Sequence, residues 1–333
     1  MKMKKWKRSI AVLICFILAI GTFAGCGNSD EKIEGDDAYA GYPEKPIEII
    51  VPYAAGGGTD VMARAVAKYL ELGQPAVVTN IEGGSSAIGT MEAYNRKPDG
   101  YTILCSMPEA LMAYHLGGVL KVPAHEDLEM IATVVYDGNV ISVAKDSKFK
   151  SIEDVIAYAK ENPGKLNWAS VGAKSSNEQA SAEFWQAAGI EVNYVPYDSA
   201  SKSRVAVMGG HADVLFGQIS EIKAVVDSGD LIPLAVSTAE RSKFFPDAPT
   251  FKELGYDIEN GLHRGFMAPK GTPKEIINKL EAALKDVSEN PEFIKLLEEN
   301  LGYQAQFVGA DELETYIEER WPIQESLYKL IAE

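Results

Sequence analysis

The chain predicts an α/β fold built from mainly parallel sheets that are flanked by helices. Two observations support this prediction. From residue 42 onward, short runs rich in β-branched residues alternate with amphipathic helical patterns, and such alternation is typical of parallel sheets with helices on both faces. Several apolar runs are also followed at once by a loop rich in glycine or serine and then by a helix start.

The first part of the body contains three predicted strands and one predicted helix. The strands are expected over 47–51, 76–79 and 101–105. The helix begins at Thr59 and Asp60. Met62 and Val66 are four residues apart and therefore share its apolar face. Cys105 lies in the third strand and is expected to be a small buried hydrophobic side chain.

The middle part of the chain repeats this alternation. Ser151 and Asp154 have the spacing of a capping box, so they predict a helix that ends near 162–164. Further strands are expected over 166–170, 191–195, 212–216 and 231–236, and further helices over 177–188 and 203–209. The strand at 191–195 is expected to end at Pro196.

Two helices are predicted near the C-terminus. Thr272 is expected to cap the first, with Pro273 in its first turn and Glu275 reaching back to the cap. An apolar stripe over 276–287 follows at helical spacing. A final amphipathic helix is expected from about 311 to 332.

The N-terminus has the three parts of a secretory signal. Five basic residues precede an apolar run over 10–24, which ends in small residues before Cys26. The run is shorter than the roughly 20 residues that span a bilayer. The closing Ala24-Gly25-Cys26 resembles a bacterial lipobox, so residues 1–25 are expected to be a lipoprotein signal peptide. An uncleaved membrane anchor with a chance cysteine is the alternative.

Lipidation at Cys26 would hold the protein on the outer face of a membrane, because two acyl chains on one cysteine give durable anchoring. Residues 26–41 are polar, acidic and glycine-bearing, so they are expected to form a flexible tether. The predicted location is therefore extracytoplasmic, with the body attached to the cell membrane through the lipid.

Composition limits the partners that the chain could have. Removal of residues 1–25 takes away five basic and no acidic residues, which moves the formal charge from −16 to −21. So acidic a chain is a poor partner for nucleic acid, because phosphate affinity comes from lysine and arginine. About 300 mature residues usually form two domains. Cys15 leaves with the signal and Cys26 carries the lipid, so Cys105 has no partner for an intramolecular disulfide.

The loop over 54–60 is the first candidate for a ligand site. It contains three consecutive glycines, it follows a strand and it opens a helix. Glycines let backbone N–H groups approach a ligand, and the helix start adds free donors and the positive end of its dipole. A carboxylate or phosphate could bind there without a charged side chain. The alternative is a glycine-rich connection in which Thr59 is a simple N-cap.

Three other loops follow strands in the same way. They cover 83–86, 172–177 and 197–199, and in an open α/β sheet the ligand site lies beyond the carboxyl ends of the strands. Hydroxyl and N–H groups of the loop at 172–177 could meet an anion from the opposite side. Lys174 could add charge there or be a solvated surface residue, and Tyr197 could close the pocket or only pack.

The order of several motifs resembles the extracytoplasmic solute receptors of the tripartite tricarboxylate transporter family, also called Bug receptors. The resemblance covers the chain from residue 42 to the C-terminus. Its main motifs are Tyr42-Pro43, Ile50-Val51-Pro52-Tyr53, Gly56-Gly57-Gly58-Thr59-Asp60, Pro98-Asp99-Gly100-Tyr101-Thr102, Asn162-Pro163-Gly164, Val195-Pro196-Tyr197, Pro249-Thr250 and Gly271-Thr272-Pro273.

The resemblance implies a two-domain type II periplasmic-binding-protein fold, or Venus-flytrap arrangement. Domain 1 would comprise 42–139 plus 238–333, and domain 2 would comprise 140–237. A small carboxylate would bind in the interdomain cleft and pass to the membrane subunits of a transporter after domain closure. The implied ligand-binding residues are Tyr53, Gly57, Gly58, Thr59, Asp60, Ser85, Ser86, Lys174, Ser175, Ser176, Tyr197 and Asp198.

Three segments depart from the family pattern and leave the identity of the ligand open. In one of them, Gly261-Leu262-His263-Arg264-Gly265 stands where the family often has an aromatic residue near His263. Ser85-Ser86 stands where a second glycine pair is common, and Glu109 stands where small polar residues or histidine are expected. Arg264 either pairs with a second carboxylate of the ligand or with surface acids, and we favour the surface acids.

Two other function classes fit the sequence less well. An exported hydrolase would need a nucleophile or a metal site, but the chain has no Gly-x-Ser-x-Gly motif and its four histidines show no paired metal spacing. His125, beside Glu126 and Asp127, is expected to be a polar loop residue. No catalysis, metal or cofactor is therefore expected. A lipoprotein that senses a carboxylate, or acts as a scaffold without a transporter, remains the second alternative.

Overall fold

The computed structural model describes residues 39 and 41–332, and the chain from Gly41 onward forms one compact unit. The predicted signal peptide, the lipidation site Cys26 and most of the predicted tether lie outside the described residues. Within the described part of the chain, no helix combines the length and apolar character needed to cross a membrane.

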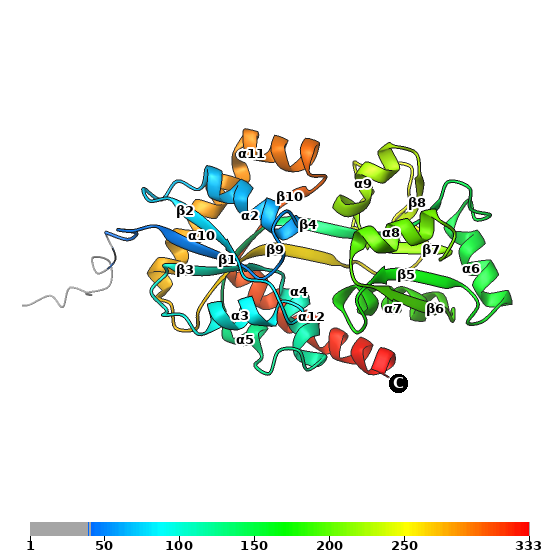
Figure 1. Cartoon of the computed structure of the whole chain (residues 1–333), viewed down its shortest axis with the longest axis horizontal. Coiled ribbons are helices and arrows are strands. Elements are labelled where there is room, and N and C mark those ends of the chain that lie inside the picture. Colours follow the sequence, from blue (N-terminus) through cyan, green and yellow to red (C-terminus); the bar gives the residue numbers. More distant parts are fainter. Residues whose placement is uncertain (1–38, 40, 333) are drawn as a thin grey trace, which may run out of the picture. The chain divides into compact units, whose positions relative to one another are not determined.

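Strands and helices alternate along most of the body (Figure 1). The strands are β1 (Ile47–Val51), β2 (Ala76–Asn80), β3 (Thr102–Ser106), β4 (Glu129–Ala144), β5 (Asn167–Val171), β6 (Asn193–Tyr197), β7 (Val214–Gln218), β8 (Leu231–Val236), β9 (Gly261–Ala268) and β10 (Gln304–Gly309). The helices are α2 (Gly58–Tyr69), α3 (Ala87–Tyr94), α4 (Pro108–Leu116), α5 (Ala124–Asp127), α6 (Ile152–Glu161), α7 (Ser176–Ala188), α8 (Ala200–Met208), α9 (Ile219–Asp227), α10 (Lys274–Glu289), α11 (Pro291–Lys295), the π-helical η1 (Leu296–Asn300) and α12 (Ala310–Ala332).

The sheet has parallel ends and an antiparallel centre. Its strand order is β2-β1-β3-β9-β4-β7-β5-β6, and β8 and β10 both pair with β4. The pairs of β1 with β2 and β3, and of β5 with β6 and β7, are parallel. Every pair that involves β4 or β9 is antiparallel. The predicted α/β class is confirmed, but the sheet is mixed and not mainly parallel. Strands β4 and β9, which were not predicted, run antiparallel to their neighbours.

The long strand β4 connects the two groups of parallel strands (Figure 1). Its residues Glu129 to Gly138 pair with β9 and β10, whereas Asn139 to Ala144 pair with β7 and β8. The predicted division into 42–139 plus 238–333 and 140–237 stays a prediction.

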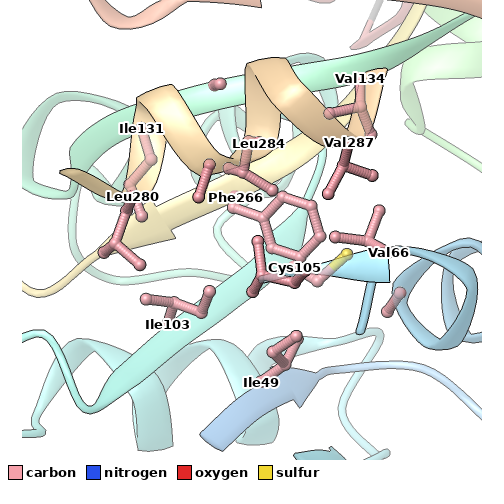
Figure 2. Packing of buried hydrophobic residues seen from close by; sticks show 14 of the residues in the cluster. Ile49, Val66, Ile103, Cys105, Ile131, Val134, Phe266, Leu280, Leu284 and Val287 are labelled. Carbon is pink, nitrogen blue, oxygen red and sulfur yellow. The ribbon is translucent and has the colours of Figure 1, made fainter. Parts of the chain in front are cut away.

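The largest apolar cluster lies between the first strands and helices α2 and α10. Figure 2 shows the Phe266 ring of β9 among Cys105, Leu284 and Val287. Cys105 is fully buried, as its apolar strand predicted. The apolar residues of the α10 stripe are buried as well, and removal of such surface from water is the main stabilising contribution to folding.

Three local expectations were wrong. Strand β6 continues through Pro196, which a strand at the edge of a sheet tolerates because one side of it needs no ladder donor. The Thr272 hydroxyl donates to the Pro269 carbonyl, so Pro273 occupies the N-cap of α10 without a side-chain cap bond. His125 lies in α5, is 2% exposed, and stacks on Trp321 of α12.

Candidate functional site

A cavity of about 880 Å³ lies where the predicted loops meet. One part of its wall comes from the loops before α2 and α3, and another comes from the loops before α7 and α8. Helices α4 and α9, strand β9 and the end of β7 complete the wall. The cavity therefore brings together segments that are more than 100 residues apart in the sequence.

The start of α2 presents backbone donors to the cavity. Gly57 is the N-cap and supplies no side-chain bond, and the N–H groups of Gly58, Thr59 and Asp60 have no hydrogen-bond partner among the described residues. Gly58 is required by close packing, because a Cβ there would lie 2.3 Å from the Tyr303 hydroxyl oxygen. The first turn of a helix attracts anions through such donors and through the helix dipole.

The start of α7 has the same character on another part of the wall. The Ser175 hydroxyl accepts a hydrogen bond from the Glu178 N–H over 3.2 Å and donates to the Val171 carbonyl over 2.7 Å. The N–H groups of Ser176 and Asn177 have no partner in the described part of the chain. Two helix starts thus offer main-chain donors to one cavity.

The loop before α3 contributes buried hydroxyls. Ser85 and Ser86 both have left-handed backbone conformations, with φ angles of 53° and 76°. Ser86 is 4% exposed, and its hydroxyl has no partner among the described residues. The Tyr53 hydroxyl is also buried and forms no hydrogen bond with a described residue. Burial raises the pKa of Tyr53 well above its usual value. The loop before α3 therefore adds polar side chains to this part of the cavity wall.

All predicted ligand-binding residues line this cavity except Asp60. The Asp60 carboxylate accepts hydrogen bonds from Gly56 N–H over 2.8 Å and from the Asn80 side chain over 2.9 Å, and it pairs with Arg64. Burial opposes ionisation of Asp60, but these hydrogen bonds hold its pKa below the usual value. Asp60 therefore fixes the glycine loop rather than facing the cavity.

Lys174 and Asp198 lie on the wall formed by the loops before α7 and α8. Lys174 is exposed and has a φ of 55°, and its backbone N–H donates to the Glu178 carboxylate. The Asp198 carboxylate pairs with Lys202 over 2.5 Å. The ion pair with Lys202 holds the pKa of Asp198 below its usual value.

The expectation that Arg264 pairs with surface acids was wrong. It is 5% exposed and lines the cavity, and its Nη2 lies 3.1 Å from the Asp137 carboxylate. Burial alone would lower the pKa of Arg264, but the neighbouring Tyr303, Asp137 and Glu221 raise it, so the guanidinium stays charged. Sequence reasoning considered Arg264 but could not foresee its burial in the cavity wall, because β9 was not predicted.

The structure also places Glu109 and Glu221 differently from what the sequence indicated. Glu109 is buried away from the cavity wall, where its carboxylate contacts the His263 backbone N–H and, over 2.8 Å, the His263 Nδ1. Glu221, in the first turn of α9, lines the cavity and was not foreseen as a site residue. Among the described residues, no group of three histidine, cysteine or acidic side chains is placed to hold a metal ion.

Comparison with known proteins identifies the relatives of this chain. Residues 61–330 match the family described as tripartite tricarboxylate transporter family receptor. The chain is 35% identical over 271 residues to the protein BugT of Bordetella pertussis, and the match covers 78% of this chain and 80% of BugT.

Solved structures show the same fold. A TctC solute-binding protein from Polaromonas is 32% identical, with a TM-score of 0.75 over 86% of this chain and 99% of its own. The periplasmic binding protein BugD is 29% identical, with a TM-score of 0.72 over 87% and 99% of the two chains. An R. palustris protein solved with adipate is 25% identical, with a TM-score of 0.76 over 87% and 98%. The predicted periplasmic-binding-protein fold is confirmed by these likenesses.

Proposed function

Because the chain belongs to the tripartite tricarboxylate transporter family receptors, we propose that it captures a small organic carboxylate in the 880 Å³ cavity. It then delivers this solute to the membrane subunits of a transporter of the same family. The family consists of solute-binding receptors rather than enzymes, so the solute leaves unaltered.

One observation carries the proposal. The first turns of α2 and α7 open onto the same cavity, and their N–H groups have no partners among the described residues. A carboxylate can accept hydrogen bonds from both helix starts at once, and the dipoles of both helices favour its charge. The R. palustris relative that was solved with adipate supports this ligand class.

Capture proceeds by closure in this proposal. The loop before α2 and the loop before α7 lie at different ends of the strand order, so a ligand that contacts both binds best when they are close together. A ligand can shift an equilibrium only by its differential affinity for the two states. Contact with both helix starts supplies that difference, and the membrane subunits then recognise the closed form.

Location follows from the N-terminal sequence. We infer that Cys26 carries the lipid and that the acidic segment behind it tethers the body outside the cell membrane. Metabolic labelling with a radioactive fatty acid tests this directly. Label should enter the wild-type chain and should be absent from the Cys26→Ala variant.

Two substitutions test the binding site itself. Thr59→Leu and Ser175→Leu place bulky apolar side chains at the two helix starts, so titration calorimetry should detect no binding of the acids that the wild-type protein binds in a thermal-shift screen. Loss of the Ser175 cap also costs about 1 kcal/mol. Ser151→Leu removes an equivalent cap from α6, away from the cavity, and should leave affinity unchanged. Unchanged affinity in both cavity variants would refute the proposed site.

A further inference from the structure

Four charged side chains line the cavity, and only two of them have ion-pair partners among the described residues. The four are Lys174, Asp198, Glu221 and Arg264. Asp198 pairs with Lys202, and Arg264 pairs with Asp137. Neither the ammonium of Lys174 nor the carboxylate of Glu221 forms an ion pair with any described residue. The cavity thus contains one unpaired cation and one unpaired anion.

Glu221 has no structural task that the contacts reveal. It occupies the third position of α9, where a glutamate can bond back to the N-cap. The N-cap Gln218 receives no such bond, and α9 has no side-chain cap. Among the described residues, the Glu221 side chain forms no hydrogen bond, and outside the helix ladder its backbone carbonyl accepts one from the Arg204 guanidinium.

Glu221 itself disfavours a second negative charge close to it on this wall. Arg264 is shared between the ion-paired Asp137 and the nearby Glu221, and Arg204 is a second cation near Glu221, so these four groups together carry no net charge. A dicarboxylate that placed an anionic end beside Glu221 would be repelled by this carboxylate. A positively charged hydrogen-bond donor would instead give the Glu221 carboxylate the ion-pair partner that it lacks.

We propose that the solute is a zwitterion, a small organic acid that also bears an ammonium group, and that Glu221 binds this ammonium. The inference rests on the proposed function, because the carboxylate end occupies the helix starts described above. Lys174 lies at the edge of the α7 helix start, so it adds positive charge on the side where the carboxylate binds. Glu221 is then the residue that separates amino acids from plain acids.

Matched pairs of acids test the inference in the full chain, purified in a mild detergent. Calorimetric titrations compare glutamate with glutarate, 2-aminoadipate with adipate, and 6-aminohexanoate with hexanoate. The ammonium-bearing member should bind at least about tenfold more tightly in one or more pairs, as a charge-assisted hydrogen bond in a buried site allows. Glu221→Gln should remove that preference and leave the affinity for hexanoate within about threefold. The two plain dicarboxylates should bind this variant at least as tightly as they bind the wild type.

Asp227→Asn is the matched control, because Asp227 lies in the same helix, is exposed and pairs with Lys223. This variant should keep the preference of the wild-type protein. The inference is overturned if, in every pair, the ammonium-free acid binds at least as tightly as its ammonium-bearing partner, with or without uptake of a proton. It is also overturned if Glu221→Gln keeps the preference for the ammonium-bearing acid. Failure of all six acids to bind would instead refute the carboxylate site, and the zwitterion inference with it.

Discussion

The Arg264 guanidinium donates a hydrogen bond from Nη1 to the Thr59 hydroxyl over 2.9 Å. This bond joins strand β9 to the first turn of α2, although the two residues lie 205 positions apart in the sequence. The other end of the guanidinium pairs with Asp137 of β4. Arg264 therefore ties the first turn of α2 to strands β9 and β4 at the cavity wall.

Removal of the Thr59 hydroxyl tests whether its bond with Arg264 stabilises the fold. Thr59→Val keeps the shape of the side chain but leaves a buried donor of Arg264 without its oxygen acceptor. We expect the free energy of unfolding, measured by urea denaturation, to fall by about 1–3 kcal/mol. Thr59→Ser restores the hydroxyl and should recover most of this loss. Equal stability of the two variants would show that the bond does not matter.

Loss of the buried ion pair between Asp137 and Arg264 should lower the free energy of unfolding by a larger amount. Asp137 is 2% exposed and also accepts a hydrogen bond from the Ser220 hydroxyl over 2.6 Å. Asp137→Asn removes the carboxylate that contacts the Arg264 guanidinium, so urea denaturation should show a loss of about 3–5 kcal/mol. Asp230→Asn breaks an exposed pair with Lys145 and should leave the midpoint unchanged. Similar small effects of both variants would contradict the account.

Local pattern predicted the parallel parts of the fold well. Strand β1 and the loop before α2 were predicted because an apolar run, three glycines and a helix start lie next to one another in the sequence. The capping box of Ser151 and Asp154 is present as predicted, since it depends only on residues three apart. In such segments, local preference and tertiary packing favour the same structure.

Strand β9 and its arginine could not be predicted in the same way. The segment from Gly261 to Gly265 has two glycines and no β-branched residue. In the structure Gly265 nevertheless packs against β4 so closely that a Cβ would lie 2.2 Å from the Ala132 carbonyl oxygen. Long-range pairing decides this structure. Arg264, Asp137 and Glu221 meet only because β4, β9 and α9 do, and no local signal marks that meeting.

Glu221 should make stability depend on pH in a definite direction. Burial is the main cause that raises the pKa of Glu221, so the folded state favours the protonated form. Its contribution to stability is complete below the pKa of the unfolded chain, about 4.3, and is lost as pH rises through the higher folded pKa. Glu221→Gln should therefore melt at a higher temperature than the wild type at pH 7.

The pH profile supplies the control for that prediction. The melting curves of wild type and Glu221→Gln should converge below about pH 4, where glutamate is protonated in both states. A variant that melts lower than the wild type at pH 7 would mean that the Glu221 charge is stabilised by protein contacts. That result would also remove the reason to seek a cationic group in the ligand.

His125 predicts sensitivity to acid. Burial, followed by the neighbouring His115, lowers the pKa of His125 to about 4, whereas the unfolded value is about 6.5. Stability from its neutral form is present above about pH 6.5 and is lost as pH falls toward 4, at most about 1.4 kcal/mol per pH unit. His125→Phe keeps a ring on Trp321 and should lose less free energy of unfolding over this range. An unchanged slope would assign the acid loss to other groups.

The crystal structure of the chain with the tightest-binding acid from the titrations tests the central claim most directly. We predict a carboxylate of that acid inside the cavity, with its oxygens about 2.9 Å from N–H groups in the first turns of α2 and α7. An acid bound elsewhere, or held in the cavity without contact to either helix start, would contradict the account.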